Sequence, residues 1–464
     1  MKRLNLLRAV MICAPLAFGA CALKRPPGQE ELARQALPNV KVPAAWTAGT
    51  SARGEVATDW LESFGEPRLD ALVREALAYN TDLMAAAARM DQAAASLTIA
   101  GASLYPAVDV IGRAKHKVSG GGTTDVTGVI FTASWEIDVW GRVRYGTRAA
   151  EEDYRSTEAD YEYARQSIAA LVAKAWFVAA EAAVQQQTAR NAVEASLHTA
   201  DIARVRFRVG SGDERDITLA ETSLQTYRDT LRQLDLAREQ ALRAIEVLVG
   251  RYPAAAMDAA SALPPLPSPV AAGVPSQLLE RRPDVIAAER RVAAAFNRVG
   301  EAKAAKLPRI SLLAGLNWIH SSMFLLANRS NPGAAAGVGL GFPLFDGGAS
   351  QGYVELRTAE QKRAVAQYAA TGLKAFNEVE TALAAEASLV EREKLLLQAL
   401  GQSERTVQLS EVQFKVGKID QRAILTDQLQ LYAARVQLTR VRAEALAQRV
   451  NLHLALGGGI TLAQ

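Results

Sequence analysis

Residues 207–210 read FRVG, and the chain reads FKVG again at 414–417, an offset of 207 residues (417 less 210). The same offset relates LVG at 248–250 to ALG at 455–457, and DVWG at 138–141 to FDGG at 345–348. Nearer the N-terminus, NTDL at 80–83 recurs as RPDV at 282–285 and YP at 105–106 as LP at 307–308, with an offset of 202 (284 less 82). Two constant offsets predict an internal duplication, with a loop of variable length between residues 106 and 141.

The duplication divides the chain into two repeats and a linker. We place repeat 1 at 66–252 and repeat 2 at 276–457. The segment between them, 253–275, is rich in proline, which excludes a continuous helix and predicts an extended surface linker. Residues 1–20 are interpreted as a signal peptide, 21–65 as a lipid-anchored, extended N-terminal segment, and 458–464 as a C-terminal tail.

Each repeat is predicted to contain a pair of β-strands, at about 107–139 and at about 309–345. Apolar residues alternate with polar or small ones on both sides of a loop at 119–122, and again on both sides of a Gly/Asn/Pro-rich loop at 328–333. Such alternation, bounded by turn residues, is typical of strands. In the last strand, glycines alternate with Val338, Leu340 and Phe342, and they leave room on one face for a neighbour or a lumen.

The rest of each repeat is predicted to be helical. An opening helix at 66–104 ends before Pro106, and long segments without a strong breaker follow at 141–209 and 348–416. Glycine turns at 210–213 and 417–420 reverse the chain into returning helices that reach Gly250 and Gly457. A helix of this length extends about 100 Å, at 1.5 Å per residue. Each repeat is therefore predicted to be a long antiparallel helical pair with a strand hairpin at one end.

The strand count has a consequence for assembly. Strands of this length suit a membrane barrel, but four cannot close one, and an open sheet edge cannot face lipid. Two chains would supply eight strands, whose interior side chains nearly fill, whereas three would supply twelve and a usable lumen. The sequence favours three chains over two only if the barrel must have an open lumen.

The N-terminus is typical of an exported protein. Lys2, Arg3 and Arg8 precede a short apolar run that ends in LAFGAC at 16–21. This ending resembles a bacterial lipobox, which implies lipidation of Cys21 with palmitate among the attached acyl chains, although Phe18 stands where the pattern prefers leucine. The alternative is an ordinary secretory signal. Ala22, rather than aspartate, follows the cysteine, which in lipoproteins implies delivery to the outer membrane.

Other sequence features exclude several classes of protein. Cys13 lies in the signal, so the mature chain has a single cysteine and no internal disulfide. No other apolar run is as long as a transmembrane helix. The net charge of +4 is small and interspersed, which argues against nucleic-acid binding. We predict no enzyme, no cofactor and no metal site, because nucleotide and nucleophile motifs are absent. The histidines are scattered through different predicted elements: His116, His198, His320 and His453.

Several motifs resemble the outer-membrane factor family, the TolC- and OprM-like efflux ducts. They are WEIDVWGR at 135–142, FPLFDGG at 342–348, ERRPDV at 280–285 and the two glycine turns. The resemblance covers nearly the whole mature chain and is nearest to the lipoprotein branch. It implies a homotrimer with a twelve-stranded barrel in the outer membrane and an α-helical tunnel across the periplasm. It also implies a periplasmic adaptor protein and an inner-membrane pump, commonly of the resistance-nodulation-division type, that supplies the energy.

The resemblance also assigns roles to residues at the turns. It implies adaptor contact for six of them, which could instead only cap helices: Arg208, Val209, Gly210, Lys415, Val416 and Gly417. It implies a periplasmic gate of acidic residues after the second turn, where the candidates are Asp420, Thr426 and Asp427. The alternative is a solvated helix face. Symmetry-related carboxylates around a narrow axis repel one another and favour cations.

The predicted function is a passive efflux duct of a tripartite system in the outer membrane. The alternative is a lipid-anchored periplasmic coiled-coil adaptor or scaffold that does not span the membrane. Adaptors normally carry one helical hairpin, whereas this chain is predicted to carry two, with two strand pairs of membrane length. The sequence identifies neither the transported substrate nor the cognate pump.

Overall fold

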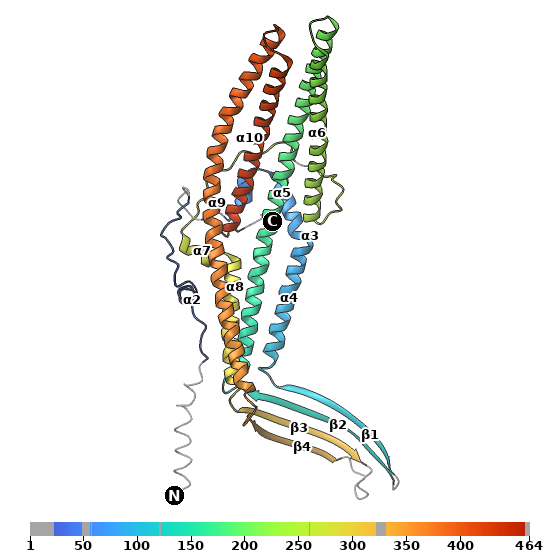
Figure 1. The fold of residues 1–464 in the computed structure, drawn as a ribbon. Coiled ribbons are helices and arrows are strands. Elements are labelled where there is room, and N and C mark those ends of the chain that lie inside the picture. The colour runs from blue at the N-terminus through green and yellow to red at the C-terminus, as the bar shows by residue number, and fades with distance from the viewer. Residues whose placement is uncertain are drawn as a thin grey trace. The chain divides into compact units, whose positions relative to one another are not determined.

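The computed structural model describes residues 23–48, 56, 58–119, 122–258, 260–321 and 331–459, with backbone alone for those among 117–126 and 319–332. Figure 1 shows the elements. In chain order they are α2 (Gln29–Ala36), η2 (Trp60–Phe64), α3 (Pro67–Tyr79), α4 (Thr81–Ala102), β1 (Ala107–Ser119), β2 (Gly122–Ile137), α5 (Arg142–Arg208), α6 (Glu214–Leu248), α7 (Pro275–Arg281), α8 (Pro283–Ala304), β3 (Arg309–Ser321), β4 (Asn331–Gly341), α9 (Ala349–Lys415) and α10 (Gln421–Ala455).

The predicted order of helix, hairpin, long helix and returning helix occurs twice. Both long helices have 67 residues and both returning helices have 35. The opening helix differs from the prediction, because Asn80 separates α3 from α4 and Arg282 separates α7 from α8. Strand β4 already includes 331–333 and ends at Gly341, before the predicted limit of about 345, because Pro343 has no N–H to continue a ladder.

The chain forms two compact units, and each draws on both repeats. One comprises Met1–Val40, Ala88–Ala159 and Ile286–Thr371, and the other comprises Lys41–Ala87, Asp160–Val285 and Gly372–Gln464. A repeat in the sequence is therefore not a compact unit of the structure. Long helices such as α5 and α9 contribute residues to both units.

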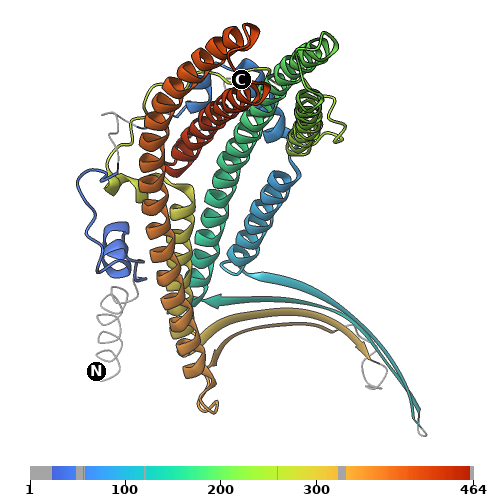
Figure 2. The ribbon, with the colours of Figure 1, turned by 45° about the horizontal axis from the view of Figure 1, so that its top comes forward.

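The first unit contains one antiparallel sheet with strand order β1-β2-β3-β4, drawn side by side and curved in Figure 2. Strands β2 and β3 pair across the two repeats, with Phe131 opposite Leu316. Among the helices of this unit, α8 packs closely on α5. A Cβ atom at Gly300 would lie 2.6 Å from the ring of Tyr145, and Arg298 pairs with Asp153. Repeat 1 and repeat 2 are thus joined both by strands and by helices.

The second unit has a hydrophobic core in which Trp60, Trp176 and Phe177 are almost fully buried. Contrary to the sequence prediction, α5 contains an 18-residue stretch that is long and apolar enough to cross a membrane by composition, and 56% of that stretch is buried. Ile168 and Val172 of α5 are among the core residues. Packing within the protein therefore accounts for an apolar helix of this kind.

The N-terminal segment is not extended throughout, since it contains α2 and η2. Residues just before the undescribed stretch are fixed on the second unit. The Trp46 indole donates to the carbonyl of Ala272 at 3.1 Å, and the Glu380 carboxylate accepts from the backbone N–H groups of Thr47 and Ala48 at 3.0 and 2.7 Å. These bonds lower the pKa of Glu380, although its partial burial opposes them. Cys21, the signal and residues 460–464 lie outside the described residues.

All four long helices end in the same glycine motif. The glycines at their C-termini have positive φ angles between 69° and 77°. In each case the N–H groups of the glycine and of the residue after it donate hydrogen bonds to carbonyls in the last turn of the helix. The four glycines are Gly210, Gly250, Gly417 and Gly457. The duplication therefore preserves a local conformation that other residues adopt only with strain.

The breaks in the opening helices are also duplicated, with different side chains. The Asn80 side chain donates to the carbonyl of Leu248 at 2.8 Å, and Arg282 donates to that of Ala455 at 3.1 Å. Leu248 and Ala455 are equivalent positions at the 207-residue offset (455 less 248). Asn80 also caps α4 by accepting from Leu83 N, whereas Arg282 precedes a proline. Each returning helix thus ends against the break in its own opening helix.

This junction predicts a difference between two glycine substitutions. A Cβ atom at Gly250 would lie 2.7 Å from the carbonyl oxygen of Tyr79, whereas one at Gly210 would meet nothing within 4 Å. Gly210→Ala is expected to cost about 1–2 kcal/mol for the left-handed conformation alone. Gly250→Ala adds overpacking of about 1–3 kcal/mol. Thermal unfolding followed by circular dichroism checks this, and equal shifts for the two variants would contradict it.

Candidate functional site: sheet faces, helix turns and buried ion pairs

The register of the sheet places apolar side chains on one face. Residues directly opposite one another in neighbouring strands share a face, and so do residues two apart along a strand. On this basis one face, here called the apolar face, carries apolar or small residues across all four strands, and Thr127 and His116 are polar members of it toward the β1–β2 turn. Its apolar and glycine members are Val108, Val110, Gly112, Ala114, Val129, Phe131, Ala133, Trp135, Ile137, Ile310, Leu312, Ala314, Leu316, Trp318, Ala334, Ala336, Val338 and Leu340.

The opposite face, here called the polar face, carries charged, hydroxyl and small residues, interrupted by Ile111, Ile130 and Leu313. On β4, from Gly333 to Gly341, it consists of glycines and one alanine. Large side chains of the apolar face are exposed within the chain, for example Val110 at 60% and Leu340 at 72%. An exposed apolar surface of this extent marks a region that contacts a membrane or another protein. The sheet therefore has one face suited to lipid and one suited to water.

The WEIDVWGR motif joins this sheet to α5. Glu136 pairs with Arg142 through two bonds of 3.0 and 2.8 Å. Asp138 accepts from the backbone of Val143 and Arg144 at 3.0 and 2.9 Å and so caps the helix. Asp346 does the same before α9, and these bonds lower its pKa. The two motifs therefore hold strand-to-helix junctions.

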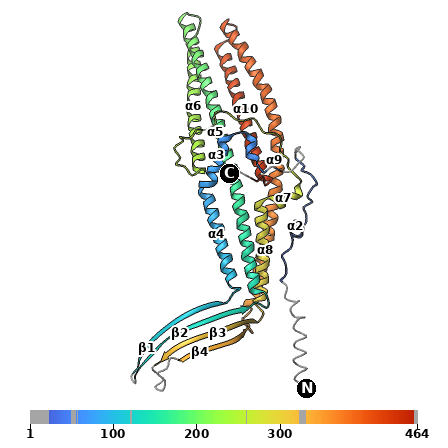
Figure 3. The same ribbon diagram turned by 180° about the vertical axis from the view of Figure 1, so that it is seen from behind.

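The two helix turns lie at the same end of the second unit, as Figures 1 and 3 show. Their valines project into solvent, with Val209 71% and Val416 64% exposed. Arg206 of α5 lies 4.8 Å above the ring of Phe414 of α9, so the two long helices contact one another just before their turns. Gly210 and Gly417 both cap helices, as expected, and Arg208 and Lys415 are exposed.

The candidate gate residues lie in the first turns of α10 and bond within the chain. Asp420 caps the helix by accepting from Ala423 N at 2.9 Å, and Thr426 donates to the carbonyl of Arg422 at 2.9 Å. The Asp427 carboxylate accepts from the hydroxyl of Ser410 at 2.5 Å and thereby links α10 to α9. The structure thus separates a capping role at Asp420 from a helix-pairing role at Asp427.

The two hairpins differ at this point. Subtracting the repeat offset of 207 from Ser410 and Asp427 gives Ala203 and Ala220, which are 1% and 0% exposed and form an apolar cluster in repeat 1. The Ser410–Asp427 pair therefore makes the second hairpin polar where the first is apolar.

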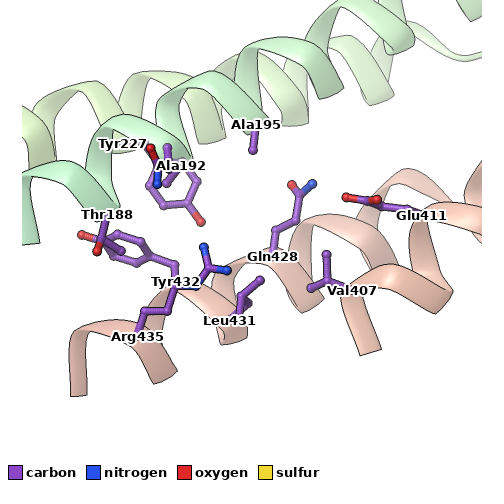
Figure 4. Close-up of a pocket in the computed structure, with 11 residues that line it drawn as sticks. Thr188, Ala192, Ala195, Tyr227, Val407, Glu411, Gln428, Leu431, Tyr432 and Arg435 are labelled. Atoms are coloured by element: carbon purple, nitrogen blue, oxygen red, sulfur yellow. The ribbon is translucent and has the colours of Figure 1, made fainter. Parts of the chain in front are cut away.

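A groove of about 220 Å³ lies between α5 and α6 on one side and α9 and α10 on the other, as drawn in Figure 4. The rings of Tyr227 and Tyr432 meet edge to face at 5.3 Å. Burial raises the pKa of both phenols. Arg435, at one end, pairs with Glu404 at 3.0 Å. No sequence pattern pointed to this groove, because it forms only when the two repeats pack together.

The sequence also did not predict that two arginines, Arg449 and Arg282, are fully buried. Arg449 forms two bonds with Glu386, at 2.9 and 2.7 Å, and donates to the carbonyls of Pro267 and Ser268 in the linker. Arg282 pairs with Asp284 and Glu378 at 2.7 and 2.6 Å. The sequence signal that could have indicated pairing is the spacing of three arginines seven residues apart on α10. Arg435, Arg442 and Arg449 all pair with glutamates of α9.

His453 is buried and stacks on Trp60 with ring centroids 5.4 Å apart. Burial, together with the charge of Arg449, lowers the pKa of His453 to about 3, so this imidazole is neutral. In the part of the chain that the structure describes, no group of three His, Cys, Asp or Glu residues could hold a metal ion.

These features define a class of protein: a helical chain with a sheet of which one face is suited to lipid and the other to water. Comparison with known proteins gives the same class. The sequence profile described as "Outer membrane efflux protein" matches residues 72–251 and 274–458, which nearly coincide with the two repeats. The chain belongs to this family, and it is an outer-membrane efflux channel component.

Relatives of known name cover almost all of the chain. The pyoverdine export outer membrane protein OpmQ of Pseudomonas aeruginosa is 30% identical over 481 residues, which cover 99% of this chain and 97% of that protein. The cation efflux system protein CusC of Escherichia coli is 26% identical over 96% of this chain and 98% of that protein. The crystal structure of the CmeC outer membrane channel of Campylobacter jejuni superposes with a TM-score of 0.84, at 22% identity, over 96% of this chain and 95% of that one.

Proposed function

We propose that three copies of this chain pool their sheets into one closed barrel of twelve strands, with the apolar face toward lipid and the polar face lining a lumen. The observation that carries the proposal is the sheet itself, with its two chemically distinct faces and outer strands β1 and β4 that pair on one side only among the described residues. Unpaired strand edges are not tolerated in lipid, so the edges must be joined between chains.

Disulfide cross-linking of β1 to β4 of a neighbouring chain tests this arrangement. A cysteine at Val110 is combined with single cysteines along the apolar face of β4, at Ala334, Ala336, Val338 or Leu340. We expect one combination to give covalent trimers in denaturing gels, together with a trimeric mass in detergent. Cysteine at Val129, in the interior strand β2, is the control and is expected to give none. A monomeric mass with no cross-linked species would contradict the proposal.

We also propose that the two helix turns bind a periplasmic adaptor, through which the duct meets an inner-membrane pump. Val209 and Val416 are large, apolar and exposed, as the contact residues of an interface are. The other four predicted contact residues flank them in the chain: Arg208 and Lys415 add one positive charge beside each valine, and Gly210 and Gly417 follow. Energy would come from the pump, since transport through the duct is passive.

Charge at the turns is expected to uncouple the duct from its adaptor. Val209→Glu combined with Val416→Glu is expected to lower export to the level of a deletion strain, because an unpaired carboxylate opposes burial in an interface. Helix content and the amount of trimer remain unchanged, since both positions are exposed. The matched control is glutamate at Leu236, which is 52% exposed on α6. Normal export by the double variant would contradict adaptor contact at the turns.

Asp427 is proposed as the gate residue and Asp420 as its helix cap, with Thr426 between them. Ser410→Ala combined with Asp427→Ala gives the second hairpin the alanine pair of the first. We expect this variant to raise single-channel conductance several-fold, because it removes a bond between α9 and α10 and a carboxylate near the turn. Asp420→Asn retains an N-cap and is expected to leave conductance unchanged. Unchanged conductance in the variant with Ser410→Ala and Asp427→Ala, or raised conductance in Asp420→Asn, would contradict the assignment.

Lipidation of Cys21 would tether the N-terminal segment to the membrane. Membership of the efflux family does not support the alternative of a periplasmic scaffold. Mass spectrometry of the mature N-terminus distinguishes an acylated Cys21 from an ordinary cleaved signal.

A further inference from the structure

The charges on the polar face of the sheet are distributed unevenly. Near the helices, Glu136 pairs with Arg142 at 2.8 Å and lies 3.7 Å from Arg309, so both cations there have a carboxylate partner. Toward the β1–β2 turn, the polar face carries Arg113 and Lys115. Both are exposed, and neither forms an ion pair with any described residue.

No acidic residue shares the levels of these two cations. Arg113 lies opposite Gly128, and Lys115 lies opposite Val126. One step nearer the helices, the polar face holds Ile111, Ile130, Asn317 and Gly333 across the four strands. The first acid is Asp109, level with Thr132. Among the side chains that the structure describes, the polar face therefore carries two unpaired positive charges, those of Arg113 and Lys115, between the β1–β2 turn and Asp109.

The small residues of β4 leave these charges facing open space. Gly333, Ala335 and Gly337 occupy the polar face of that strand, so no long side chain from it reaches across. In the proposed trimer, six cations would surround a water-filled lumen with a low-dielectric wall. Such a wall focuses the field of like charges and raises the local concentration of counter-ions.

We propose that Arg113 and Lys115 form an anion-attracting ring inside the barrel, near the β1–β2 turns, which favours passage of anionic solutes. This inference rests on the proposed trimeric barrel. It assigns the duct a preferred substrate class, organic anions, and gives the barrel a share in selection. Because both side chains lie on the polar face, lipid headgroups around the barrel are not their ligands.

Two variants, each with one engineered cysteine, test both the anion-attracting ring and the proposed barrel. The natural cysteines are Cys13 and Cys21 alone, so the parent protein supplies the labelling background. Thr132→Cys places a thiol on the polar face beyond the ring, and Phe131→Cys places one on the apolar face beside it. Intact cells are treated with an anionic reagent, sulfonatoethyl methanethiosulfonate, or with its cationic trimethylammonium counterpart. In either case the thiolate displaces a sulfinate and forms a disulfide.

We expect the cysteine at 132 to react and the cysteine at 131 to remain protected. The ratio of anionic to cationic reaction rates, each divided by the rate with a free thiol, is expected to fall about tenfold when Arg113→Gln and Lys115→Gln are added. Asp109→Asn is expected to raise the ratio, because it removes the neighbouring carboxylate. Arg228→Gln with Arg232→Gln, on exposed positions of α6, removes the same charge and is expected to change nothing.

The two failures are distinguishable. If the cysteine at 132 reacts with the same ratio before and after removal of Arg113 and Lys115, the anion ring is wrong and the barrel stands. If the cysteine at 131 reacts and that at 132 does not, the faces are assigned wrongly and the proposed function fails with them. All variants are first shown to give trimers equal in amount to the parent.

Discussion

The substitution Phe131→Arg is expected to prevent assembly of this protein in the outer membrane. Phe131 lies on an interior strand and its ring meets that of Trp318 edge to face, with centroids 6.4 Å apart. A guanidinium on the lipid face of a barrel costs about 2–4 kcal/mol at the midplane. In a trimer that cost arises in every chain. We expect Phe131→Arg to abolish trimers in outer-membrane fractions.

The neighbouring residue provides the control. Thr132 is on the polar face, opposite Asp109 and Gly315, so Thr132→Arg places the same charge beside a carboxylate and open space. This variant is expected to assemble at near-normal levels. Loss of assembly by Thr132→Arg, with tolerance of Phe131→Arg, would mean that the faces of the sheet are reversed.

Removing the Arg449 side chain is expected to be the most destabilising change in the second unit. Its guanidinium is 1% exposed, and Glu386 is 14% exposed. Arg449→Met would leave that carboxylate and two linker carbonyls without their donor. Breaking a buried ion pair by removing one partner costs about 3–5 kcal/mol. We expect a large fall in the midpoint of thermal unfolding, followed by circular dichroism.

A matched pair one heptad away separates burial from pairing. Arg442 and Glu393 also join α10 to α9, at 2.7 Å, but their side chains are 45% and 27% exposed. Arg442→Met is therefore expected to cost about 1 kcal/mol or less. Adding Glu386→Met to Arg449→Met is expected to restore much of the stability, because no buried charge is then unpaired. Equal effects of the two arginine variants would contradict a special role for Arg449.

Local sequence signals predicted the elements but not their contacts. The glycines at 210 and 417, the alternation around Phe131 and the unbroken runs in α5 and α9 are each encoded within a few residues, and the structure contains these features. The pairing of β2 with β3 depends on residues nearly 200 positions apart. No local pattern specifies this pairing, although the internal repeat predicted two equivalent hairpins.

Other features depend on tertiary partners. Asn80 breaks the opening helix because its side chain finds Leu248 and caps α4, and neither partner is visible in a run of helix-forming residues. No local pattern predicts the burial of Arg449 and Arg282, which are buried because carboxylates and carbonyls surround them. At Asp427, the resemblance suggested a gate, and the structure adds a partner, Ser410, that no motif contained.

The central claim is that the pooled strands form a pore, and single-channel recording in planar bilayers tests it most directly. The purified mature protein is recorded, and its mass in detergent is measured on the same sample. The account predicts discrete, stable conductance steps from a trimer, with larger steps in the variant that carries Ser410→Ala and Asp427→Ala. A folded protein that is monomeric, or a trimer that never conducts even after the two glycine turns are removed, would contradict it.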